Sequence, residues 1–107
     1  ALMSSGMNGQ NFAFNGYLPI DEKEKIRKIK LLEKISNNSG QTQIFMETPY
    51  RNNKLLNTLI KVCNSKTMLC IASNITQNNE SIVSKSIEEW KFSNFRPNKN
   101  PSIFLIS

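Results

Sequence analysis

The sequence predicts an α/β fold, a mixed sheet of about five strands flanked by helices. Three observations support this prediction. Short apolar segments of strand length recur along the chain, longer segments with helical apolar spacing lie between them, and helix-start signals precede those longer segments. Because residues 68–72 are apolar throughout, we expect helices to cover both faces of the sheet at this strand.

The first elements are predicted from a cap and from aromatic spacing. Residues 1–8 are typical of the end of a helix that closes at Gly6, since glycine suits a left-handed cap. Residues 11–18 are then expected to form a strand that ends at Pro19, with Phe12 and Phe14 on one face.

A long helix is predicted over 21–36. Asp21 followed by Glu24 matches a capping box, and apolar residues at spacings of three and four line one side of the helix: Ile26, Ile29, Leu32 and Ile35. The run of Asn and Ser before Gly40 is expected to stop the helix. Residues 42–47 follow as a strand.

The second half of the chain continues the alternation of predicted strands and helices. Thr48 as cap and Pro49 in the first turn predict a helix that runs to about Cys63. Strands are expected over 68–72, 82–85 and 102–106, with loops over 76–81 and 94–101. Ser86 and Glu89 form a second capping-box pattern and predict a short helix that carries Trp90.

Composition bounds the class of protein. A chain of 107 residues is expected to be one domain with one core, and no apolar run approaches the roughly 20 residues of a membrane span. The absence of histidine excludes a Ser-His-Asp triad, a Cys-His pair and a histidine-ligated metal from this chain alone. Cys63 and Cys70 lack a disulfide framework, which favours a reducing, cytoplasmic setting.

The net charge of +6 allows two interpretations. Clustered basic residues gain affinity for RNA by releasing counterions from its phosphates. Eleven of the fourteen basic residues are lysine, however, and over 21–34 they alternate with glutamate, which favours a solvated helix face. A non-catalytic basic RNA-binding module therefore stays an alternative function.

The junction from Met46 to Arg51 is the strongest candidate site. A strand runs there directly into a helix start, and ligands of open α/β sheets collect at the carboxyl ends of strands, where first-turn N–H groups attract anions. A helix start without a ligand explains the same pattern. The small residues Ala72 and Ser73 also follow a strand, and they form either a ligand contact or a plain turn.

Several segments in order resemble the C-terminal half of the tetrapyrrole (corrin/porphyrin) methyltransferase family. Its branch of 16S ribosomal RNA 2′-O-ribose methyltransferases has ALxxSGL, FxFxGFLP, E-[ST]-P-[HY]-R and A-R-E-L-T tracts. This chain has ALMSSG, FAFNGYLP, ETPYR and ASNIT in the same order. The last tract lacks the branch's Arg-Glu pair, so the resemblance leaves ribosomal RNA and a small molecule as acceptor classes.

The resemblance implies that residues 1–107 are the single C-terminal domain of a two-domain methyltransferase that uses S-adenosyl-L-methionine. The absent N-terminal domain would be the partner across the cofactor cleft, and a homodimer is expected. The fragment alone is expected to be inactive. The residues implied to contact the cofactor are Met46, Glu47, Ala72, Ser73, Pro101 and Ile103, and those implied to contact the substrate are Tyr50 and Arg51. No catalytic residue and no metal are expected within the chain.

Overall fold

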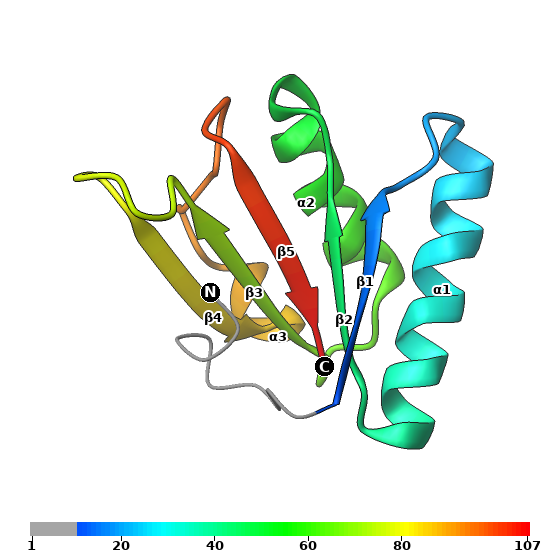
Figure 1. Cartoon of the computed structure of the whole chain (residues 1–107). Helices are drawn as coiled ribbons and strands as arrows, with labels where there is room; N and C mark the ends of the chain where they lie inside the picture. The colour runs from blue at the N-terminus through cyan, green and yellow to red at the C-terminus, as the bar shows by residue number, and fades with distance from the viewer. Residues whose placement is uncertain (1–10) are drawn as a thin grey trace.

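The computed structural model describes residues 11–107, which form a five-stranded sheet with packed helices (Figure 1). The strand order is β1-β2-β5-β3-β4. Strand β1 (Phe12–Tyr17) is parallel to β2 (Thr42–Met46), whereas β5 (Ser102–Ile106) is antiparallel to both β2 and β3 (Met68–Ser73), and β4 (Ser81–Ser86) is antiparallel to β3. The predicted mixed α/β sheet is confirmed. The helix expected within residues 1–8 lies outside the described residues.

One edge of the sheet gathers several strand ends. The carboxyl ends of β1, β2 and β3 lie there beside the beginnings of β4 and β5, at the top of Figure 1. In register, Met46 lies beside Ile103, and Ser73 lies between Ser102 and Ser81. We call this side of the sheet the upper edge.

The helices are α1 (Glu22–Ser39), the 3-10 turn η1 (Pro49–Arg51), α2 (Asn52–Val62) and the short α3 (Ile87–Trp90). The prediction that the first helix ends at residue 36 was wrong by one turn. The helix continues to Gly40, whose φ of 72° forms the left-handed cap and whose N–H donates to the carbonyl of Ser36.

The two predicted capping boxes, at the starts of α1 and α3, differ in how many of their hydrogen bonds form. The side chain of Asp21 accepts from the backbone N–H of Glu24, but the carboxylate of Glu24 accepts from Arg27 at 2.6 Å. At α3 both halves of the capping box are present, because Ser86 and Glu89 each accept from the other's backbone N–H. This box lets a helix of four residues begin cleanly after β4.

The main core lies between one face of the sheet and the helices. It contains residues of β2, β3 and β5 together with residues of α1, α2 and α3; its largest members are Trp90, Phe45 and Phe104. The rings of Phe45 and Phe104 stack with centroids 6.0 Å apart, and the Trp90 indole donates to the carbonyl of Leu69 at 2.9 Å. The first contact joins β2 to β5, and the second holds α3 on β3.

The expectation that helices cover both faces was wrong for residues 11–107. The described helices contribute to the core on one face, whereas the second cluster consists of strand residues alone, including Ile44, Cys70 and Leu105. We call this second side the helix-free face. An apolar strand such as β3 indicates that both of its faces are shielded, but it does not indicate that helices do the shielding. Among these residues no helix has the length and apolar character that crossing a bilayer requires.

Both cysteines are free and buried. Burial raises the pKa of Cys63 to about 12, with a further contribution from the nearby Glu33, and burial raises the pKa of Cys70 to about 11. Because only the thiolate reacts, we expect both thiols of the folded protein to react with a disulfide reagent at pH 8 at least about 100-fold more slowly than after denaturation in urea. Equal labelling rates in the two states would contradict this prediction.

Candidate functional site

A pocket of about 270 Å³ opens at the upper edge, where β2 ends and β5 begins. Its lining comes from the end of β2, the loop after β3 and the start of β5: Met46, Asn74, Ile75, Gln77, Pro101, Ser102 and Ile103. We call it the sheet-edge pocket. Three of the six residues expected to contact the cofactor, Met46, Pro101 and Ile103, therefore lie together in one concave site.

A fourth expected residue extends the same row. Register places Ala72 beside Ile103 and Ile103 beside Met46, so the three residues lie across β3, β5 and β2 on the helix-free face. Ala72 is fully buried there. The loop that follows is tied back to the site, because the N–H of Asn74 donates to the carbonyl of Pro101 at 2.9 Å. Asn74 and Thr76 have positive φ values of 53° and 67°.

The other two expected residues are buried with their side chains bonded inside the fold. The hydroxyl of Ser73 is 2.7 Å from the hydroxyl of Ser102. Glu47 forms an ion pair with Lys25 of α1, with 2.6 Å between the Lys25 Nζ and the Glu47 Oε2. Neither residue lines the sheet-edge pocket. Their assignment to the cofactor stays a prediction. Because both side chains are bonded within the fold, we expect any contact with the cofactor to come from their backbone groups.

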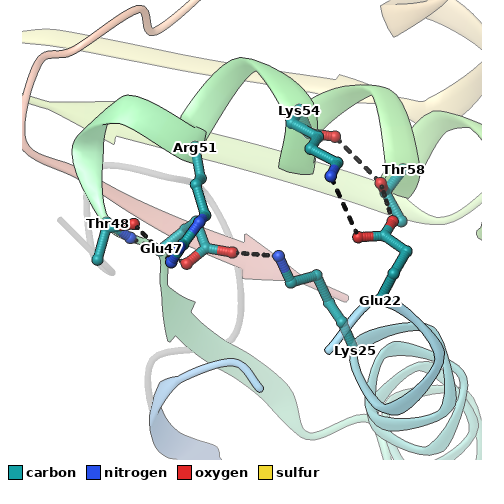
Figure 2. A network of polar contacts seen from close by, with 7 residues as sticks. All are labelled: Glu22, Lys25, Glu47, Thr48, Arg51, Lys54 and Thr58. Atoms are coloured by element: carbon teal, nitrogen blue, oxygen red, sulfur yellow. Dashed lines mark hydrogen bonds and ion pairs between the residues drawn. The ribbon is translucent and has the colours of Figure 1, made fainter. Parts of the chain in front are cut away.

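The Lys25–Glu47 ion pair anchors α1 to the upper edge, and both side chains are only 2% exposed (Figure 2). The second carboxylate oxygen of Glu47 accepts from the backbone N–H of Thr48 at 3.0 Å, which holds the turn from β2 into η1. Arg51 then donates to the hydroxyl of Thr48 at 3.3 Å. A chain of polar contacts thus fixes the junction that the sequence singled out.

A second set of contacts in Figure 2 joins α1 to α2. The hydroxyl of Thr58 donates to Glu22 at 3.1 Å, and the ammonium of Lys54 lies 3.9 Å from the same carboxylate. Sequence reasoning missed Lys25 and its role, because the lysine-rich helix was interpreted as a solvated face. The spacing indicated that Lys25 is buried. It precedes the buried Ile29 by four residues and the buried Leu32 by seven, which places all three on one side of the helix.

The residues expected to contact substrate lie near a different hollow. A cavity of about 580 Å³ is lined by Pro49, Tyr50, Asn53, Asn98, Lys99 and Asn100, and we call it the loop pocket. Tyr50 is 65% exposed, and the guanidinium carbon of Arg51 lies 4.8 Å from the centre of its ring. Tyr50 thus lines this pocket, and Arg51 contacts the Tyr50 ring without lining the pocket. Asn98 and Lys99 were not predicted from the sequence.

Two solved structures with this fold are named as methyltransferases. The methyltransferase CobJ matches 100% of the chain and 45% of its own length, with a TM-score of 0.57 and 13% identity. Uroporphyrin-III C-methyl transferase from Thermus thermophilus, solved in complex with S-adenyl homocysteine, has a TM-score of 0.56 and 14% identity over 99% of the chain and 48% of its own length. At these identities the likeness shows the fold alone.

A curated relative adds likeness in sequence. Ribosomal RNA small subunit methyltransferase I of Vibrio cholerae serotype O1 (strain ATCC 39315 / El Tor Inaba N16961) is 35% identical over 91 residues, which cover 83% of the chain and 30% of that protein. The chain thus resembles a ribosomal RNA methyltransferase in sequence, and CobJ and the uroporphyrin-III methyltransferase in fold. No family model matches the sequence. The chain spans about a third of the length of this curated relative and about half of each of these two solved structures.

Proposed function

We propose that the protein carrying this chain is a methyltransferase that uses S-adenosyl-L-methionine, and that the chain forms one wall of the cofactor cleft at the sheet-edge pocket. The observation that carries this proposal is the 35% identity to a ribosomal RNA methyltransferase over 83% of the chain. The pocket lies within the matched fold, at the strand ends where α/β sheets bind ligands.

The residues of the pocket suit part of such a cofactor. Met46, Pro101 and Ile103 offer apolar surface to the flat face of a purine, and Gln77 of the loop after β3 adds a polar side chain to the lining. The volume of 270 Å³ is smaller than the roughly 300 to 1,000 Å³ of complete small-molecule sites. A pocket of this size supports the proposal of one wall whose opposite side comes from elsewhere.

The cofactor would supply an electrophilic methyl group on a sulfonium, and the base that takes up the acceptor's proton is not assigned to a residue of this chain. The part proposed for its residues is alignment and exclusion of water. Met46 and Ile103 form an apolar surface of the pocket. Glu47 holds the β2–η1 junction through its contacts with Lys25 and the Thr48 N–H. In this proposal Glu47 and Ser73 act through their backbone groups, because their side chains bond within the fold.

We favour ribosomal RNA as the methyl acceptor over a tetrapyrrole. The relative with 35% identity is named for ribosomal RNA, whereas the uroporphyrin enzyme matches at 14%. The net charge of +6 suits a polyanionic acceptor. The absent N-terminal domain, a homodimer and a cytoplasmic location remain predictions that accompany this proposal.

Calorimetric titration with S-adenosylhomocysteine tests the cofactor site. In the full-length protein, Met46→Glu is expected to weaken binding by at least about tenfold, because a carboxylate in the apolar wall would be desolvated by the ligand. Met68→Glu is the matched control, since Met68 lies on the same helix-free face at the opposite end of β3. Its affinity should equal that of the unmodified protein.

Two results would contradict the proposal. Failure of the unmodified full-length protein to bind S-adenosylhomocysteine would remove the methyltransferase function. Equal weakening by Met46→Glu and Met68→Glu would instead rule out the sheet-edge pocket as the binding site. A charge anywhere on the helix-free face would then be sufficient to weaken the binding of S-adenosylhomocysteine.

A further inference from the structure

The loop pocket is a second concave site, next to the sheet-edge pocket. One wall comes from η1 and the start of α2, and the other from residues 98–100, which lead directly into Pro101 of the sheet-edge pocket. At about 580 Å³ it falls within the range of small-molecule sites. Among the described residues, its lining carries one ammonium, from Lys99, and no carboxylate.

Its walls are held in place by buried and paired amides. The side chain of Asn52 is fully buried and donates to the carbonyls of Asn98 at 3.2 Å and Asn100 at 2.8 Å. Asn53 accepts from the N–H of Asn98 at 2.9 Å and donates to its side-chain oxygen at 3.1 Å. Asn98 itself has a φ of 53°. The pocket is therefore preformed, which lowers the entropic cost of binding.

Its contact groups suit a nucleotide. Tyr50 is 65% exposed and is not a member of either core cluster, and the guanidinium carbon of Arg51 lies 4.8 Å from the centre of its ring. Exposed aromatic rings stack on unpaired bases, and nearby cations attract the phosphates between them. Lys99 supplies such a cation within the same lining. The pocket lacks the broad apolar surface that a membrane or an amphipathic helix would require.

We propose that the loop pocket binds one nucleotide of a single-stranded RNA segment, with Tyr50 stacking on the base and Lys99 facing the phosphate. This inference deepens the proposed function and rests on it. It names single-stranded RNA as the acceptor strand and places the binding site for that strand next to the sheet-edge pocket. Asn52 and Asn53 act as positioning residues that shape the loop.

Fluorescence anisotropy with a short fluorescein-labelled oligouridylate tests the pocket in the full-length protein without cofactor. Tyr50→Ala is expected to weaken binding about tenfold, within the range measured for loss of one stacked base, and Tyr50→Phe is expected to retain most of it. Phe92→Ala is the matched control. Phe92 is 84% exposed and follows α3, toward the edge of the sheet opposite the pocket.

The phosphate contact has its own readout. Lys99→Ala should reduce the slope of log affinity against log salt by about one, the change expected when one phosphate contact is lost. Lys30→Ala on the exposed side of α1 removes the same charge away from the pocket and should leave the slope unchanged.

Each contrary outcome overturns the inference. No binding of the oligouridylate by the unmodified protein, equal losses in Tyr50→Ala and Phe92→Ala, or equal slopes in Lys99→Ala and Lys30→Ala would each do so. The titration with S-adenosylhomocysteine separates the two proposals: Tyr50→Ala should leave it unchanged. If the protein binds RNA through Tyr50 but does not bind S-adenosylhomocysteine, the proposed methyltransferase function is refuted and the proposed RNA site at the loop pocket is retained.

Discussion

Replacing Lys25 with methionine is expected to lower the free energy of unfolding by about 3 to 5 kcal/mol. The ammonium of Lys25 lies 2.6 Å from Glu47, and both side chains are 2% exposed. Removing the lysine leaves the Glu47 carboxylate buried, and within residues 11–107 the N–H of Thr48 is then the one group that still donates to it. Urea denaturation followed by circular dichroism measures the loss.

A double variant separates the ion pair from simple packing. Lys25→Met combined with Glu47→Leu removes both charges, so most of the lost stability should return. Lys23→Met is the control on the exposed side of α1 and should change the unfolding free energy by less than about 0.5 kcal/mol. A single Lys25 variant as stable as this control would show that the Glu47 charge is satisfied without the lysine.

Replacing Trp90 with alanine is expected to cost about 3 to 5 kcal/mol. The indole is fully buried in the main core, its ring lies 5.9 Å from that of Phe95, and its N–H donates to the carbonyl of Leu69 at 2.9 Å. Because Trp90 is the single tryptophan of the chain, its fluorescence is lost in the variant. Unfolding must therefore be followed by circular dichroism.

Two further variants show how much of this loss of stability comes from side-chain volume and how much from the hydrogen bond. Trp90→Phe keeps most of the ring and loses the donor to Leu69, so a smaller loss of about 1 to 3 kcal/mol is expected. Phe92→Ala, two residues along and 84% exposed, should change stability little. If Trp90→Ala unfolded at the same urea concentration as Phe92→Ala, the indole would not hold α3 on the sheet.

Local patterns predicted the elements well and their surroundings less well. Strand β5 matches its predicted bounds, and Asp21 and Ser86 cap the helices as expected, because these signals act over a few residues. The end of α1 was placed one turn early, since asparagine is tolerated in a last turn and Gly40 sets the actual stop. The apolar run of β3 predicted burial correctly but not the element that provides it.

The candidate site was predictable where it lies on regular strands. Met46 and Ile103 lie side by side because register aligns the end of β2 with the start of β5. The partner of Glu47 was not predictable, since Lys25 lies 22 residues earlier in a helix rich in exposed lysine. The loop pocket depends on amide contacts between residues 52–53 and 98–100, and contacts at that separation leave no local pattern.

The position of β5 constrains how the protein can be synthesised. Although β5 is the last element in the sequence, it lies in the middle of the sheet and joins β2 to β3. Without β5, the pairs β1–β2 and β3–β4 would have no strand to join them, and the apolar sides of both pairs would be left uncovered. A stop codon before residue 102 would therefore remove the central strand rather than trim an end.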